Sequence, residues 1–167
     1  YKYYNGSWTQ LGQDINGEAY DDHSGFSVSL SSDGNIVAIG SRYNDGNGSN
    51  SGNVRIYKNN NSTWSQIGQD IDGEATSDYS GHSVSLSSDG NIVAIGAYAN
   101  DGNGTTAGHV RVYQNNNDSW TQIGQDIDGE NSGSQSGFSV SLSSQGNIVA
   151  IGAPNNYGNG TYSGHVR

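Results

Sequence analysis

Carboxylates recur at a fixed spacing in this sequence, and they are the residues best suited to binding a metal ion. Asp70, Asp72 and Glu74 occupy alternate positions, and copies of the pattern occur 56 residues earlier and 56 residues later. Alternate residues of a continuous strand lie on one face, so the three carboxylates would point to the same side. Oxygen ligands of this kind suit Ca²⁺, and Asp101 in a nearby loop could add a further ligand. Because Asn16 replaces the middle acid of the first copy, solvated acidic turns are the preferred interpretation; a calcium site is the alternative, and no other cofactor is indicated.

Asparagine glycosylation is the second chemistry that the sequence suggests. Two sets of Asn-x-Ser/Thr triplets recur every 56 residues, and the pattern survives although its middle residue varies and its third residue alternates between Ser and Thr. The triplets lie in predicted loops, where a glycan could be accommodated. The alternative is that these are ordinary turn residues, copied together with the repeat. We predict N-linked glycans at Asn5, Asn61 and Asn117 in the first set and at Asn47, Asn103 and Asn159 in the second.

The sequence contains no recognisable catalytic constellation. The four histidines occupy three different positions of the repeat, whereas a catalytic histidine in a repeat protein should recur or join other reactive groups. The many serines lack the Gly-x-Ser-x-Gly context of a nucleophile elbow. We therefore predict that the protein is not an enzyme. The histidines expected at the surface or at sheet edges are His23, His82, His109 and His165.

Aromatic side chains allow two interpretations. They could form platforms for sugar rings, or they could attach an outer strand to the core. Because Trp8, Trp64 and Trp120 keep one position in every repeat, we predict that they belong to the core. The tyrosines that could contribute to a sugar platform are Tyr1, Tyr3, Tyr4, Tyr57 and Tyr113.

Composition and charge restrict the partners. Only 31% of the residues are hydrophobic, and 16 acidic residues against 6 basic ones give a net charge of −10. This charge repels nucleic-acid phosphates and anionic membrane surfaces, so we expect no nucleic-acid partner. No apolar stretch approaches the ~20 residues of a membrane span. Cysteine is absent, which excludes disulfides and thiolate metal sites.

The chain consists of three near-copies of one 56-residue unit, residues 1–56, 57–112 and 113–167. A period of this size marks a repeat array, in which one unit cannot bury its apolar face alone and must stack on its neighbours. The chain begins and ends within a repeat, so we expect a segment of a longer array or one protomer of a head-to-tail assembly. The expected partners are therefore identical repeats or protomers, together with N-linked glycans.

Short runs of alternating apolar residues divide the middle repeat into strands. The predicted strands are residues 83–87, 92–95, 109–113 and 120–127. Asp89-Gly90 between the first two strands is predicted to form a type I′ hairpin turn. Gly124 within the fourth strand indicates a bulge or a close backbone approach. Each unit is thus predicted to be a four-stranded antiparallel meander without helices.

The repeat also resembles a known family. Ser24–Leu30, Val149–Pro154 and Gly164–Arg167 look like the FG-GAP repeat, the blade motif of integrin α-chain β-propellers and of many extracellular adhesion proteins. The resemblance covers all three copies and implies propeller blades. The middle copy departs from the motif with His82 in place of Phe. Calcium-binding members of the family use an Asp-rich loop between the first two strands, and here that connection is only Ser88–Asn91.

The sequence thus predicts an all-β fold of tandem four-stranded antiparallel meanders, with β-propeller-like blades running from about residue 24 to 79 and from 80 to 135. Three blades cannot close a ring, since propellers have about four to eight. The array is therefore expected to be an open segment of a larger propeller or of a filament. We predict a non-catalytic, extracellular or cell-surface structural or adhesive protein, N-glycosylated and self-assembling. The alternative is a ligand-binding propeller, either a lectin or a calcium-dependent adhesion module.

Overall fold

The computed structural model describes residues 1–167 and consists only of strands, turns and loops. It therefore holds no helix of the length and apolarity that a membrane crossing requires. In chain order the strands are β1 (Lys2–Tyr4), β2 (Ser7–Thr9), β3 (Ser27–Leu30), β4 (Ile36–Ser41), β5 (Asn53–Asn60), β6 (Thr63–Gln66), β7 (Ile71–Asp72), β8 (Ser83–Leu86), β9 (Ile92–Ala97), β10 (His109–Asn115), β11 (Trp120–Gln122), β12 (Ile127–Asp128), β13 (Ser139–Leu142), β14 (Val149–Ala153) and β15 (His165–Val166).

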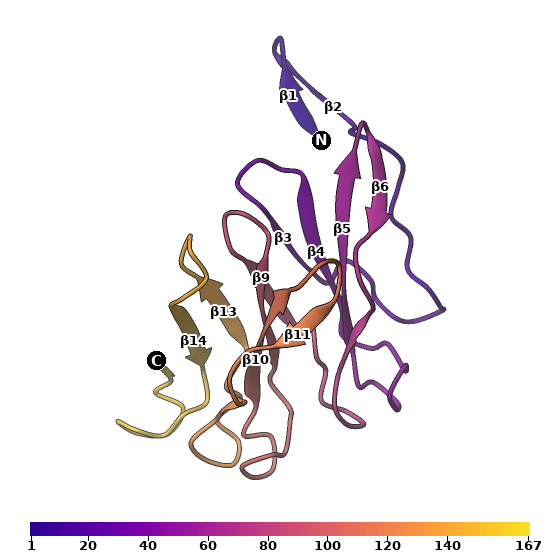
Figure 1. Ribbon diagram of the computed structural model, residues 1–167. Coiled ribbons are helices and arrows are strands. Elements are labelled where there is room, and N and C mark those ends of the chain that lie inside the picture. The colour runs from indigo at the N-terminus through magenta and orange to yellow at the C-terminus, as the bar shows by residue number, and fades with distance from the viewer.

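The strands form two complete antiparallel sheets that stand between two partial ones (Figure 1). The first complete sheet has the order β3-β4-β5-β6, and the second has the order β8-β9-β10-β11. The hairpin β1-β2 precedes them, and the three-stranded sheet β13-β14-β15 follows. Figure 1 shows these sheets side by side in chain order, without closure into a ring. The predicted all-β architecture of propeller-like blades is confirmed.

The fourth strand of each blade is broken, whereas the sequence predicted one continuous strand whose internal glycine marks a bulge or a close backbone approach. In the second blade, β11 and β12 both pair with β10, and Gly124 between them has a φ of 79°. Gly68 takes the same conformation in the first blade, with a φ of 74°. A side chain at Gly68 would collide with the indole of Trp120, which comes from the next blade. The break therefore makes room for the tryptophan of the following repeat.

The turn between the first two strands of a blade is not of the predicted type I′. Only Gly90 has a positive φ there (72°), and its N–H donates to the carbonyl oxygen of Ser87 over 3.0 Å. The carboxylate of Asp89 accepts a hydrogen bond from the Ser87 hydroxyl at 2.6 Å, which fixes a different turn with Asp89 outside the left-handed region. Positive φ at two successive residues, as type I′ requires, occurs instead at Asn61 (52°) and Ser62 (66°) in the tip between β5 and β6.

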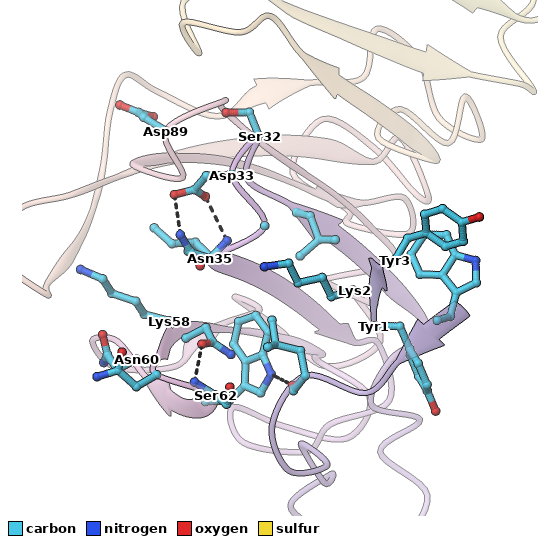
Figure 2. A pocket seen from close by; sticks show the side chains of 18 of the residues that line it. Tyr1, Lys2, Tyr3, Ser32, Asp33, Asn35, Lys58, Asn60, Ser62 and Asp89 are labelled. Carbon is cyan, nitrogen blue, oxygen red and sulfur yellow. Dashed lines mark hydrogen bonds between the residues drawn. The ribbon is translucent and has the colours of Figure 1, made fainter. Parts of the chain in front are cut away.

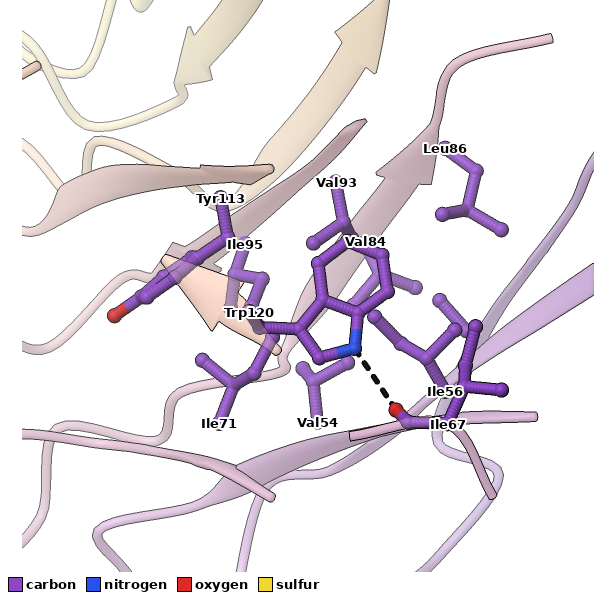
Figure 3. Packing of buried hydrophobic residues seen from close by; sticks show 11 residues of the cluster. Val54, Ile56, Ile67, Ile71, Val84, Leu86, Val93, Ile95, Tyr113 and Trp120 are labelled. Carbon is purple, nitrogen blue, oxygen red and sulfur yellow. Dashed lines mark hydrogen bonds between the residues drawn. The ribbon is translucent and has the colours of Figure 1, made fainter. Parts of the chain in front are cut away.

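The main apolar core lies between the two complete sheets (Figure 3). Successive side chains of a strand point to opposite faces, so each blade offers one apolar face to the preceding blade and one to the following blade. The first blade contributes Ala38, Val54, Ile56, Ile67 and Ile71, and the second contributes Val84, Leu86, Val93, Ile95, Tyr113 and Trp120. A smaller cluster built on Ala94, Val110 and Ile151 joins the second blade to β13-β14-β15. The core of this protein is therefore a series of layers between sheets.

Trp120 is the largest side chain of the main core, and only 4% of it is exposed. Its indole Nε1 donates to the carbonyl oxygen of Ile67 in the preceding blade over 2.9 Å (Figure 3). The side-chain amide of Gln69 bonds both the N–H (3.3 Å) and the carbonyl oxygen (2.9 Å) of Trp120. Trp64 makes the equivalent bond to the segment before the first blade, whereas Trp8 is 68% exposed. The core prediction is thus confirmed for Trp120, which joins two repeats.

We predict that Trp120→Ala lowers the free energy of unfolding by about 3–5 kcal/mol, because it leaves a cavity between two blades. Trp8→Ala removes the same side chain from a hairpin that is exposed in the single chain, so it should change the stability of the monomer by less than about 1 kcal/mol. Urea unfolding followed by circular dichroism measures both. Equal effects of the two substitutions would contradict the assignment of Trp120 to the core between the two blades.

Candidate functional site at the junctions between blades

Backbone atoms of neighbouring blades approach closely at the first strands. The junction between the first two blades is termed the first junction, and that between the second blade and β13-β14-β15 the second junction. At the first junction the Ser27 hydroxyl donates to the carbonyl oxygen of Gly81 (2.7 Å), and the Leu86 N–H donates to the Ser29 hydroxyl oxygen (2.9 Å). Both bonds recur one repeat later, at the second junction. The small serines permit the approach and also bond across it.

Glycine is required at the tightest point of each junction. A side chain at Gly40 would collide with the carbonyl oxygen of Gly81, and one at Gly96 would collide with that of Gly137. Gly152, at the same position of the third copy, meets only the side chain and carbonyl oxygen of Ser139 in its own sheet. The spacing of the blades is therefore set by contact between backbones, and Gly40 and Gly96 are the residues that allow it.

An arginine at the third strand of a blade contacts the segment that precedes the blade. Arg111 donates from Nη2 to the carbonyl oxygen of Asp72 over 2.7 Å, and its Nη1 lies 3.5 Å from Oε1 of Glu74. Arg55 and Arg167 make the same pair of contacts in their own repeats. Because Arg111 is only 6% exposed, its hydrogen bond to the backbone offsets part of the desolvation of the guanidinium. The three arginines repeat one electrostatic contact along the array.

His109 lies beside this contact at the start of β10 and is only 1% exposed. Its Nδ1 is 3.8 Å from Oε2 of Glu74 and 3.6 Å from Oδ2 of Asp126. Burial, and then the nearby Arg111, lower the pKa of His109, whereas the carboxylates oppose the shift. The prediction of a surface or edge position is therefore wrong for His109, because the preceding blade covers the start of this strand.

The four acids considered as calcium ligands do not converge. Of the four, only Glu74 belongs to a group of three possible ligand atoms within 4.8 Å of one another. The other two members of this group are His109 and Asp126. β7 ends at Asp72, so the alternation that would align Glu74 with Asp70 stops before it. Asp101 accepts a hydrogen bond from the backbone of its own loop. The sequence could not reveal the His109–Asp126 partnership, because it depends on how the repeats stack.

The two sets of Asn-x-Ser/Thr triplets differ in structure. Asn5, Asn61 and Asn117 are exposed at hairpin tips. In the second set, Nδ2 of Asn47 donates to the carbonyl oxygens of Gly73 (2.9 Å) and Glu74 (3.0 Å), and Nδ2 of Asn103 donates to that of Gly129 (2.8 Å). Asn159 is exposed in the corresponding loop of the third copy. An N-linked glycan is attached through Nδ2, so a glycan at Asn47 or Asn103 would have to replace these hydrogen bonds.

Aromatic side chains form a row along the loops of successive repeats. The ring centroids of Tyr43 and Tyr79 are 5.6 Å apart, and those of Tyr79 and Tyr98 are 5.5 Å apart and stacked. His82 adjoins Tyr98 at 4.5 Å and Phe138 at 4.7 Å. None of these residues is among the tyrosines considered for a sugar platform. The row joins side chains of three different repeats and was not evident from their spacing.

The tyrosines proposed for a sugar platform are distributed differently. Tyr113 is 9% exposed and packs in the main core. Tyr1 and Tyr3 stand on the hairpin side of the largest hollow, opposite Asp33 and Lys58 (Figure 2). The Asp33 carboxylate accepts hydrogen bonds from the turn that it belongs to. The hollow is thus an open space between the hairpin β1-β2 and the first blade.

The repeat matches a known family at two places. A family model described as the FG-GAP repeat matches residues 15–57 and 71–113, which together make up just over half of the chain. The chain belongs to the FG-GAP repeat family. The two matches are offset by the same 56 residues as the internal repeat. FG-GAP repeats typically occur in extracellular proteins and form propeller or adhesion modules that are generally non-catalytic. A comparison with curated proteins gives no match.

We predict that stability falls between about pH 6.5 and pH 4 in part because of His82. Burial, and then the nearby Arg42, lower the pKa of His82 from 6.5 to about 4. Over this interval the unfolded chain binds a proton that the folded chain does not, so stability decreases as the pH falls. His82→Phe installs the residue that the first and third copies carry at this position, Phe26 and Phe138.

The melting temperature of His82→Phe should therefore depend less on pH than that of the unchanged protein over this interval, as measured by differential scanning calorimetry. His23→Phe is the matched control, because the His23 side chain is 50% exposed. A pH dependence that is unaltered in His82→Phe would show that His82 does not resist protonation in the folded state.

Proposed function

We propose that this FG-GAP repeat chain is a non-catalytic structural or adhesive protein of the extracellular space or cell surface, N-glycosylated at its hairpin tips and assembled head to tail. The observation that carries the proposal is the chemistry of its two end faces. Each end face is one half of the junction that occurs twice inside the chain. An identical repeat, in a longer array or in a second copy of the chain, can therefore supply the missing half.

The apolar residues of the two end faces support this assembly. On the first blade Val28 is 64% exposed and Leu30 is 60% exposed, whereas the equivalent Val84 and Leu86 of the second blade are 9% and 7% exposed. At the other end Val166 is 73% exposed, although its counterparts Val54 and Val110 are fully buried. Burial stabilises such side chains by about 1.5–3 kcal/mol each, so both faces gain free energy when a matching blade covers them.

Hydrogen bonding supports the same pairing. Gln69 of the first blade bonds the backbone of Trp120, and Gln13 bonds that of Trp64 in the same way. Trp8 at one end and Gln125 at the other are the corresponding halves of this contact. The two faces are different and complementary, which defines a heterologous interface. Such an interface gives a ring where the rotation closes and a filament where it does not.

We predict that the intact chain forms oligomers whose mass rises with concentration, measured by multi-angle light scattering. Leu30→Asp places a charge on the exposed face of β3 and should shift the population to monomer without unfolding the blade. Tyr20→Asp is the matched control, because Tyr20 is 99% exposed and lies outside both end faces. A compact monomer at all concentrations would remove the assembly half of the proposal.

We predict that N-linked glycans on native material occupy Asn61 and Asn117 at the hairpin tips. Asn47 and Asn103 should be unoccupied, because their Nδ2 atoms already bond the backbone of the neighbouring turn. Peptide mapping by mass spectrometry, with and without enzymatic glycan release, measures the occupancy at each site. Bare asparagine at both Asn61 and Asn117 would remove the glycoprotein half of the proposal and leave the assembly half to its own test.

A further inference from the structure

The second blade contains a buried histidine nitrogen without a hydrogen-bond partner. Nδ1 of His109 has no such partner, and the residue is 1% exposed. Two carboxylate oxygens face it, Oδ2 of Asp126 at 3.6 Å and Oε2 of Glu74 at 3.8 Å, and both are beyond hydrogen-bonding distance. An unpaired buried polar atom is costly and calls for an explanation. The two carboxylates that face it are the groups from which an explanation can come.

We propose that Glu74, His109 and Asp126 bind one divalent transition-metal ion of the zinc class. Each residue offers one ligand atom, and the three atoms lie within 4.8 Å of one another. Zinc is bound by histidine nitrogen and carboxylate oxygen at about 2.0–2.2 Å, which places tetrahedral ligands about 3.3–3.6 Å apart. The separations of 3.6 Å and 3.8 Å between His109 Nδ1 and the two carboxylate oxygens are close to this spacing. An imidazole ligand favours zinc, copper or nickel over calcium, which prefers oxygen ligands alone.

The surrounding charges are compatible with a cation. Nη1 of Arg111 lies 3.5 Å from Oε1 of Glu74, so the guanidinium contacts the oxygen other than the one that faces His109. Asp78 adds a third carboxylate whose charge acts on His109. Three carboxylates against one guanidinium leave a net negative environment around the three ligand atoms. Burial also favours the neutral imidazole, which is the form that binds metal.

The first blade provides an internal comparison. There Asn53 replaces the histidine, and its Nδ2 donates to Oε2 of Glu18 (3.4 Å) and Oδ2 of Asp70 (3.5 Å). The amide thus bridges the two carboxylates without a metal ion. In the third copy His165 lies 3.7 Å from Glu130, and residues 1–167 contain no counterpart of Asp126 for that copy. Within residues 1–167, the second blade is the place where a histidine lies beside both carboxylates.

The test is a titration of the whole chain with Zn²⁺, in which isothermal calorimetry measures binding and the melting temperature measures stabilisation. We expect one equivalent of Zn²⁺ to bind and to raise the melting temperature, and Co²⁺ at the same site to give the visible absorption of a tetrahedral complex. His109→Asn copies the arrangement of the first blade, so it should fold and should lower the affinity for Zn²⁺ at least 10-fold. Asp126→Asn should weaken binding in the same direction, and His165→Asn, the matched control, should leave it unchanged.

Three outcomes would overturn the proposal. One is the absence of saturable Zn²⁺ binding to the unchanged chain. Another is Zn²⁺ binding that persists unaltered in His109→Asn, because the ion would then lie elsewhere. The third is stabilisation by Ca²⁺ but not by Zn²⁺, which would indicate a site of oxygen ligands alone.

Discussion

Close contact between the backbones of neighbouring blades is the constraint on which the rest of the structure depends. Gly40 and Gly96 face carbonyl oxygens of the following blade at a separation that excludes any side chain. At that spacing the serines of the first strands bond across the junction, and the valines and leucine of the next blade reach the core. A wider separation would open voids along every layer, and the packing energy of protein interiors falls steeply with such gaps.

Buried polar groups explain how a chain that is only 31% hydrophobic folds. Asp78 is 3% exposed, and its carboxylate accepts hydrogen bonds from the backbone of Ala75 and from the side chain of Asn100. Asp22 and Asn44 are paired in the same way one repeat earlier. Buried polar groups cost little when they are hydrogen-bonded. These pairs therefore hold the long loops against the ends of the sheets with few apolar side chains.

The strands and the stacking of repeats could be predicted from the sequence, because both depend on local alternation and on the period of the tryptophans. Contacts between repeats could not. Glu74 meets His109 only because a turn of the first blade lies against the start of β10 in the second blade, and the backbone partners of Asn47 lie 26 and 27 residues further along the chain. The geometry of the turn at Asp89 also escaped prediction. The Asp-Gly pair indicates a type I′ turn, but it does not reveal that the Asp89 carboxylate accepts a hydrogen bond from the Ser87 hydroxyl.

The three copies carry almost the same residues at their junctions, which affects how the chain reaches its native order. The face of β13 that packs on the second blade carries Val140 and Leu142, and β8 presents Val84 and Leu86 to the first blade. During folding, the third repeat can therefore dock where the second belongs and form a compact kinetic trap. His82 and Phe138 differ at equivalent positions of the second and third copies, and such differences distinguish the correct registry from a swapped one.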